Sequence, residues 1–171
     1  MYFDCSWFDR VIKDTWLHFK ASNGYTTAFH YTLKNLEVLY DPCSYISGLK
    51  EVLHTPYPEQ LRQNIIDRNL ALMTDKPFSS YLEQMKKAVA RNDLNSVNHR
   101  LAGFLASYFD VLFAANRLLH PGEKRLASFA VQNCRILPGD FESDMNSILT
   151  ATPSDIPVSA KKLSDNLKAI L

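Results

Sequence analysis

The sequence predicts an all-α protein, a multi-helix bundle around one long central helix at about residues 93–119. Three observations support this class. Apolar residues recur at the three- and four-residue spacing of a helix in most segments. Proline, glycine and asparagine turns separate these segments, and almost no stretch alternates in the way that a strand does. The segment 91–125 is apolar on two flanks, which is typical of a helix that is buried on several sides.

The central helix has sequence signals for both of its ends. Asn92-Asp93 provides a start, and Pro121-Gly122 is expected to stop the helix. Between these signals, one apolar flank comprises Val97, Leu101, Phe104, Leu105, Tyr108, Leu112, Ala115 and Leu119, and a second flank comprises Ala102, Leu105, Phe109 and Phe113. We therefore expect this helix at the centre of the core.

Shorter helices are predicted on either side of the central one. Before it, helices are expected at about 8–19, 26–36, 44–54, 58–74 and 78–89, the last of them capped by Asp75. Val38 to Pro42 reads as a short extended run, because the residue before a proline is pushed out of helical geometry. After the central helix, helices are expected at about 123–136 and 141–149, and a linker at 152–157 leads to a last amphipathic helix.

The N-terminus is the one place where a strand is expected. Residues 2–5, Tyr-Phe-Asp-Cys, have the composition of an edge strand, but four residues cannot form a sheet alone. We therefore treat residues 1–171 as a single helical domain, with residues 1–6 as a candidate strand remnant.

Composition and charge restrict the class further. The chain has 171 residues, of which 46% are hydrophobic and 22% are charged, and this is typical of one soluble globular domain. A net charge of +1 argues against a broad nucleic-acid surface. Cys5, Cys43 and Cys134 are widely spaced and suggest neither a zinc site nor a disulfide framework. No apolar run reaches the length of a membrane span and no signal peptide is recognisable, so a cytoplasmic protein is expected.

Three polar residues of the central helix fall on one stripe. His99, Asp110 and Arg117 lie within about 20° of one another on a helical projection at 100° per residue. Gly103 and Ala106 flank this stripe, so a ligand or another element can approach closely there. The favoured interpretation is a solvated or helix-packing face on which Asp110 and Arg117 pair loosely.

The C-terminal end of the central helix carries the best candidate binding residues. Asn116 lies among apolar neighbours and needs hydrogen-bond partners, either to fix the following turn, which is favoured, or to face a substrate. Lys124 and Arg125 stand near the start of the next helix, where two cations and free backbone donors suit a phosphate or carboxylate. For these two cations a solvated surface pair is the favoured interpretation, because Gly-Glu-Lys-Arg is too short to be a specific motif.

No catalytic constellation stands out. His18, His30, His54 and His120 have no catalytic partner at a recognisable spacing. Asp4 sits on the candidate strand, as metal-binding carboxylates of phosphoryl-transfer enzymes do, but such sites need two or three converging carboxylates. We therefore expect no catalytic residue and no metal site in this chain, unless further carboxylates join Asp4.

Five short motifs occur in order between residues 36 and 136. They are Val38-Leu39-Tyr40-Asp41-Pro42, Tyr57-Pro58-x-x-Leu61, Ala88-x-x-Arg91-x-Asp93, Leu112-Phe113-Ala114-Ala115-Asn116-Arg117 and Pro121-Gly122-Glu123-Lys124-Arg125. Their order and spacing resemble a family of uncharacterised helical domains that follow a minimal nucleotidyltransferase domain.

This resemblance implies an accessory role. Such a domain packs against a nucleotidyltransferase core and helps to hold the acceptor substrate or the nucleotide, with Mg²⁺ and a nucleoside triphosphate as the cofactors of the whole enzyme. By that analogy Asn116, Lys124 and Arg125, together with Arg91, face the cleft. Asp4 would lie on the last carboxylate-bearing strand of a catalytic sheet whose first part is missing.

The chain departs from the implied pattern in one respect. It contains neither the Gly-Ser motif nor an Asp-x-Asp motif, so metal-assisted nucleotidyl transfer has no site in it alone. One hypothesis is therefore an inactive, substrate-binding helical half of a nucleotidyltransferase-like protein. The other is a stand-alone interaction module or homodimer that docks through the aromatic N-terminus, with Tyr2, Phe3, Trp7 and Phe8.

Overall fold

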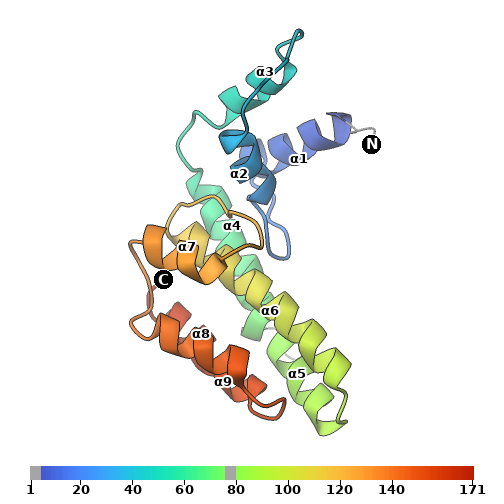
Figure 1. Ribbon diagram of the computed structural model, residues 1–171, viewed down its shortest axis with the longest axis vertical. Coiled ribbons are helices and arrows are strands. Elements are labelled where there is room, and N and C mark those ends of the chain that lie inside the picture. The colour runs from blue at the N-terminus through green and yellow to red at the C-terminus, as the bar shows by residue number, and fades with distance from the viewer. Residues whose placement is uncertain (1–4, 76–79) are drawn as a thin grey trace.

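The computed structural model describes residues 5–75 and 80–171, and every regular element in these ranges is helical (Figure 1). The all-α prediction is therefore confirmed. The helices of this part of the chain are α1 (Cys5–Leu17), α2 (Ala28–Asn35), α3 (Tyr45–Val52), α4 (Glu59–Leu70), α5 (Tyr81–Ala90), α6 (Leu94–Ala115), α7 (Leu126–Asn133), α8 (Phe141–Thr150) and α9 (Ile156–Lys168). A π-helical turn, Ala71–Asp75, extends α4.

The expected start of the central helix α6 is confirmed. Asp93 caps it, because one oxygen of its carboxylate accepts a hydrogen bond from the Ser96 backbone N–H at 3.0 Å and the other accepts one from the Ser96 hydroxyl at 2.6 Å. These bonds hold the pKa of Asp93 at about 2. The carboxylate thus satisfies an N–H group that the first turn of the helix leaves without an intrahelical partner.

The expected end of α6 is wrong by several residues. The helix ends at Ala115, well before Pro121-Gly122. The Leu118 N–H donates to the Phe113 carbonyl at 2.9 Å and the Arg117 N–H to the Ala114 carbonyl at 3.0 Å, while Arg117 adopts a left-handed φ of 53°. This is a Schellman termination, and arginine occupies the position where glycine is usual. The sequence therefore lacked the ordinary stop signal.

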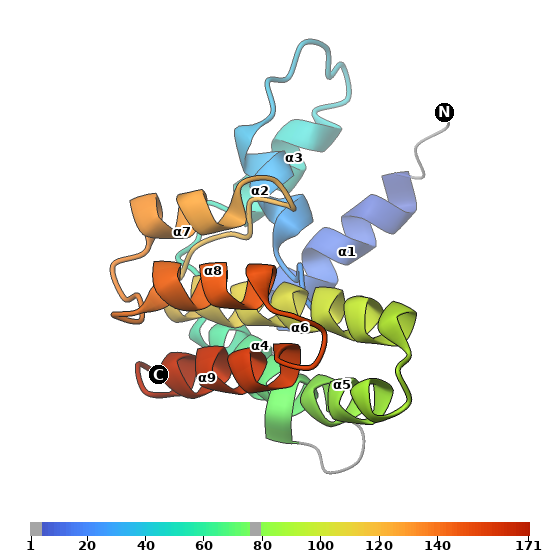
Figure 2. The same ribbon diagram turned by 60° about the horizontal axis from the view of Figure 1, so that its bottom comes forward.

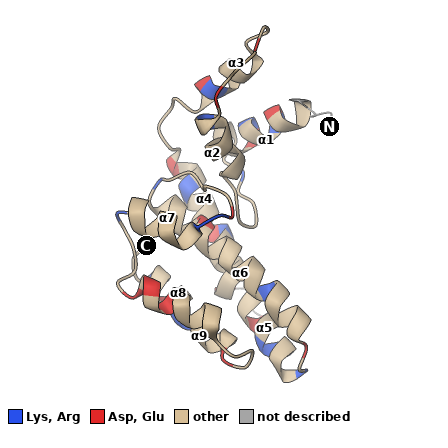
Figure 3. Cartoon of the chain, viewed as in Figure 1, with Lys and Arg blue, Asp and Glu red and all other residues tan. Residues whose placement is uncertain are grey.

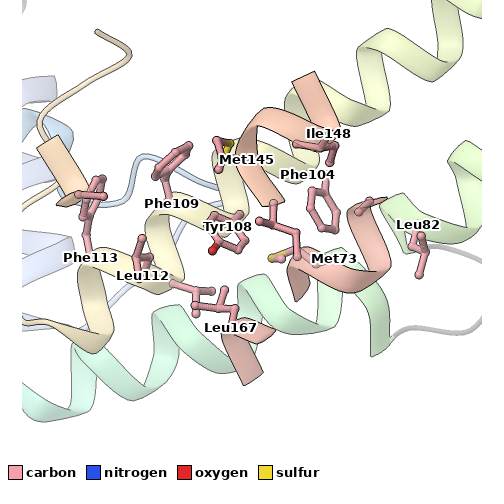
Figure 4. Close-up of a cluster of buried hydrophobic side chains, with 14 of the residues drawn as sticks. Met73, Leu82, Phe104, Tyr108, Phe109, Leu112, Phe113, Met145, Ile148 and Leu167 are labelled. Carbon is pink, nitrogen blue, oxygen red and sulfur yellow. The ribbon is translucent and has the colours of Figure 1, made fainter. Parts of the chain in front are cut away.

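The main core surrounds the C-terminal half of α6 (Figure 4). Phe104, Tyr108 and Phe113 are almost completely buried, and the side chains around them come from α4 and its π-helical turn, α5, α7, α8 and α9. Met73, Met145 and Leu167 are among those partners, as Figure 4 shows. Figure 2 shows α8 and α9 lying along one side of α6. The expected central position of this helix is thus confirmed.

Helices α1–α3 form an N-terminal lobe, residues 5–53, beside this bundle (Figure 1). The lobe has a small apolar cluster of its own, in which Phe8, Ile12, Leu33 and Leu49 are buried. Trp16 is one of its links to the main core, and the Trp16 indole N–H donates to the Thr55 hydroxyl at 2.8 Å. The lobe is therefore attached to the bundle rather than merged with it.

Several expected boundaries differ from the structure. Cys5 and Ser6 belong to α1, whereas the rest of the candidate strand, with Asp4, lies outside the described residues. Asp75 does not cap α5, because the Ser80 hydroxyl does so by accepting from the Glu83 N–H at 3.3 Å. Asp75 ends the π-helical turn and pairs with Lys168. Helix α9 begins at Ile156, inside the expected linker, because proline is tolerated in a first helical turn.

Candidate ligand site beside helix α7

Lys124 and Arg125 lie side by side in the turn that leads into α7, and both are exposed. Arg125 is the residue before the helix and has a left-handed φ of 55°, and its side chain makes no cap hydrogen bond. No described carboxylate forms an ion pair with either cation. The structure therefore leaves both positive charges available to an external anion.

A surface hollow of about 550 Å³ opens next to these two cations. Its other lining residues are Tyr31, Pro121, Ser128, Phe129 and Gln132. Tyr31 comes from α2 in the N-terminal lobe, and its ring meets that of Phe129 edge-on, with 6.0 Å between ring centroids. The hollow thus combines cations, neutral hydrogen-bonding groups and aromatic rings from two parts of the fold.

Asn116 has a structural role that accounts for its amide. Its amide N–H groups donate to the Leu112 carbonyl at 2.9 Å and to the Ile136 carbonyl at 2.8 Å, while its oxygen accepts from the Ile136 N–H at 2.8 Å. The amide therefore does not bond to the turn that follows α6, as was favoured, but holds Ile136 in the segment before α8. A second hollow of about 480 Å³ lies here and is lined by Arg117 and Arg135 among others.

Arg91 lies at the opposite end of α6. It pairs with Asp93 at 3.2 Å and lines a small hollow of about 120 Å³ with Gln84, Lys87, Ser96 and Arg100. The 22 residues of α6 separate this end from Asn116. At about 1.5 Å per residue, this is a distance of about 33 Å, so Arg91 does not join Lys124 and Arg125 in one site.

The stripe of α6 is solvated only at its ends and packs against other elements between them, and the expected pairing of Asp110 with Arg117 is wrong. His99 and Arg117 are exposed, but Asp110 is only 2% exposed. Arg117 pairs with Glu59 at 2.8 Å instead of with Asp110. Other parts of the protein pack closely against the two small residues that flank the stripe. A Cβ on Gly103 would lie 3.0 Å from the Tyr81 ring, and the Cβ of Ala106 would lie 2.9 Å from a Cβ on Gly24, in the turn between α1 and α2.

Asp110 is instead part of a buried polar cluster. Its carboxylate accepts hydrogen bonds from the Thr26 N–H at 3.0 Å, from the Thr26 hydroxyl at 2.6 Å and from the Asn69 amide at 3.3 Å. Burial disfavours the charged form more than these bonds favour it, and raises the pKa of Asp110 to about 7. No described cation forms an ion pair with Asp110.

His120 lies next to this cluster and is completely buried. Its backbone N–H donates to the Thr27 hydroxyl at 2.9 Å, and its Nδ1 accepts from the Gly122 N–H at 3.1 Å. Its Nε2 has no hydrogen-bond partner among the described residues, and burial lowers the pKa of the ring to about 4. The sequence analysis missed the roles of Thr26 and Thr27, because nothing in the sequence around this turn indicates bonds to Asp110 and His120, more than 80 residues away.

The described residues offer no grouping of three or more His, Cys, Asp or Glu side chains that could hold a metal ion. The expected carboxylate of Asp4 lies outside them. Figure 3 shows that Lys and Arg residues and Asp and Glu residues are interspersed along the chain, with neither sign confined to one helix. Within the same residues, no helix is long and apolar enough to cross a membrane.

Comparison with known proteins identifies a domain family. No curated protein and no solved structure matches the chain. The domain family that matches residues 26–126 is described as a domain of unknown function, DUF4037. The matched segment includes Asp110, Asn116, Lys124 and Arg125, and the expected membership of an uncharacterised family is confirmed at this level. Because the match covers more than half of the 171 residues, the chain belongs to the DUF4037 family.

Proposed function

We propose that this chain is a ligand-binding accessory domain of a nucleotidyltransferase-like protein. It binds a phosphate-bearing ligand, such as a nucleotide, in the hollow lined by Lys124 and Arg125. The observation that carries the proposal is the position of these two cations, which form no ion pair with a described carboxylate, beside a hollow that Tyr31 and Phe129 also line.

The chemistry of the hollow suits a phosphate group. Arginine presents its N–H donors in a fork that matches two phosphate oxygens, and lysine adds a compact charge. Ser128 and Gln132 offer neutral hydrogen bonds, while Tyr31 and Phe129 can contact the apolar part of the ligand. Because both cations are exposed, solvent screens them, and we expect a dissociation constant between about 10 μM and 1 mM, which corresponds to roughly 4–7 kcal/mol.

The association with a nucleotidyltransferase rests on the ordered sequence motifs. The chain contains neither a Gly-Ser motif nor an Asp-x-Asp motif. In this proposal another domain or chain therefore binds Mg²⁺ and the reacting triphosphate. The helical domain then contributes binding, and the catalytic residues come from its partner. Asn116 acts here by fixing the end of α6, and Arg91 lies too far away to touch the same ligand.

A thermal-shift experiment tests the binding claim. ATP, GTP and inorganic pyrophosphate are each added with and without Mg²⁺, and the melting temperature should rise because ligands stabilise the folded state that binds them. Lys124→Ala should abolish the rise, whereas Lys161→Ala, which removes an exposed lysine of α9, should leave it intact. A melting temperature that no phosphate compound changes would contradict the proposal.

Exposed apolar residues of the N-terminal lobe favour a second candidate, an interaction or homodimerising module. Leu39 is 87% exposed and Tyr40 is 84% exposed in the connection between α2 and α3. Trp7 and Phe29 meet edge-on at 5.3 Å and are both partly exposed, whereas Phe8 is buried inside the lobe. Light scattering tests the homodimer: a dimer that Leu39→Ser/Tyr40→Ser converts to a monomer supports it, and a monomer at every concentration excludes it.

A further inference from the structure

One turn between α1 and α2, residues 22–27, carries several of the hydrogen bonds that join the N-terminal lobe to the bundle. The Gly24 N–H donates to the Asn69 side chain of α4 at 2.9 Å, and Asn69 donates back to the Ser22 carbonyl at 3.1 Å. Gly24 has a φ of 82° and lies against Ala106 of α6 so closely that any side chain would clash. The turn is therefore seated tightly on α4 and α6.

The last two residues of this turn make the longest-range bonds. Thr26 binds the buried carboxylate of Asp110 through both its backbone N–H and its hydroxyl. The Thr27 hydroxyl accepts the backbone N–H of His120, in the segment that leads from α6 to Lys124 and Arg125. We call these bonds, Thr26 to Asp110 and Thr27 to His120, the latch. All four latch residues are at most 4% exposed, so water cannot readily replace the bonds.

The latch fixes the first turn of α2, from which Tyr31 projects. Thr27 is the residue before α2, and its carbonyl accepts the Tyr31 backbone N–H at 3.0 Å. Tyr31 is therefore four residues, about 6 Å along the helix axis, from the anchored residue. It is also the only residue from the N-terminal lobe among those that line the hollow beside Lys124 and Arg125.

A row of rings connects the hollow to the other side of the latch. Tyr31 contacts Phe129 at 6.0 Å between centroids, Phe129 contacts Phe113 at 5.5 Å, and Phe113 contacts His120 at 5.1 Å. The three contacts are all edge-on, an arrangement that favours one relative position of the rings. The latch and the hollow are thus two ends of one packed unit.

From these contacts we infer that the latch positions the Tyr31 wall of the hollow, and that filling the hollow and closing the latch favour each other. This inference rests on the proposed phosphate site. With the latch closed, Tyr31 is held against Phe129, and the hollow has its aromatic wall. With the latch open, α2 is free to move, and a ligand keeps only the contacts that α7 and its preceding turn provide. Coupling of this kind is reciprocal, so a ligand must also stabilise the latch.

Two substitutions of one side chain test the latch. Thr27→Val keeps the shape but removes the hydroxyl that accepts the His120 N–H, whereas Thr27→Ser keeps the hydroxyl. Calorimetric titration with inorganic pyrophosphate should give an affinity about tenfold weaker for Thr27→Val, the factor that corresponds to about one buried hydrogen bond, and an affinity near the original for Thr27→Ser. Tyr31 is the side chain that the latch positions in the hollow. Tyr31→Leu should therefore weaken pyrophosphate binding although the latch bonds remain.

Hydrogen exchange of the unaltered protein provides a second measurement, which does not require that a variant fold. Saturating pyrophosphate should slow exchange of the amides in residues 26–35 relative to a control segment such as α9. Exchange that pyrophosphate leaves unchanged in this segment would overturn the coupling, and so would equal affinities for folded Thr27→Val and the unaltered protein. No binding of pyrophosphate, ATP or GTP by the unaltered protein would contradict the proposed function itself, and the inference with it.

Discussion

Thr26 and Asp110 are 84 residues apart in the chain, yet the hydroxyl of one donates to the carboxylate of the other at 2.6 Å in the interior of the protein. Asp110 is on the central helix, and Thr26 is at the start of α2. Their contact joins the N-terminal lobe to the bundle by a bond between fully enclosed polar groups. Loss of this bond would leave the buried Asp110 carboxylate with one hydrogen-bond donor fewer.

Replacing Thr26 by valine should therefore destabilise the protein. The substitution preserves the shape of the side chain but removes the donor to Asp110 and the acceptor of the Ser22 N–H. We expect a loss of about 1–3 kcal/mol in the free energy of unfolding, measured by urea denaturation. Thr32→Val is the matched control, because the Thr32 hydroxyl is exposed and bonds only within α2. Equal effects of the two substitutions would contradict the role of the bond.

The buried histidines predict a dependence of stability on pH. Burial lowers the pKa values of His30 and His120 from 6.5 to about 4. Between pH 6.5 and 4 the unfolded chain binds these protons and the folded chain does not, so both groups make stability fall as the pH falls. Asp110, with its pKa raised from 3.8 to about 7, acts in the opposite sense, because there the folded chain holds the proton.

The net difference over this range is one proton, two from the histidines less one from Asp110. The free energy of unfolding should then fall by about 1.4 kcal/mol per pH unit from pH 6.5 to 4.5. His120→Asn should make the dependence nearly flat, because only opposing contributions from His30 and Asp110 remain. Urea denaturation at pH 4.5, 5.5 and 6.5 measures both slopes. Identical slopes in the two proteins would show that His120 is not the group concerned.

Gly24 and Gly122 provide a matched pair of glycines. Both have a positive φ, 82° and 97°, so alanine at either position adopts a strained backbone at a cost of about 1 kcal/mol. At Gly122 the added Cβ meets open space, whereas at Gly24 it would lie 2.9 Å from the Cβ of Ala106. Gly24→Ala should therefore cost about 1–3 kcal/mol more than Gly122→Ala in thermal or urea denaturation. A larger loss for Gly122→Ala would contradict the close seating of the turn.

Substitution of Asn116 distinguishes a structural role of its amide from a role in ligand binding. Asn116→Ala removes three hydrogen bonds, two of them to the Ile136 backbone, and should lower the free energy of unfolding by about 1–3 kcal/mol. Its affinity for pyrophosphate should stay unchanged at a temperature where the variant is folded. Asn133→Ala is the control, since the exposed Asn133 amide bonds only to the Phe129 carbonyl of its own helix. Lost affinity with intact stability would instead place Asn116 in the binding site.

Periodicity and capping residues were sufficient for the helical class and for the start of α6, because both depend on local sequence. The end of α6 was predicted too late because Arg117 adopts the left-handed conformation that glycine normally signals. The burial of Asp110 could not be predicted from a helical projection, since it depends on Thr26 in a turn 84 residues away. Long-range pairing of this kind leaves no periodic pattern.

The candidate site was predicted only in part. Lys124 and Arg125 do line one hollow, but Tyr31, which brings the N-terminal lobe to it, had no local signal. The separation of Arg91 from that hollow was available from the sequence, because the fixed rise of a long helix keeps its two ends apart. The resemblance placed Arg91 in the same cleft as residues from the other end of α6, and the helix length excludes one shared ligand of nucleotide size.

The central claim is that Lys124 and Arg125 bind phosphate, and a titration of inorganic pyrophosphate into the double variant Lys124→Ala/Arg125→Ala tests it most directly. Calorimetry compares this variant with the unaltered protein and with Lys161→Ala/Arg135→Ala, which removes equal charge outside the hollow. The account predicts binding by the unaltered protein and the control, and at least a tenfold loss in the double variant. Equal affinity in all three proteins would contradict it.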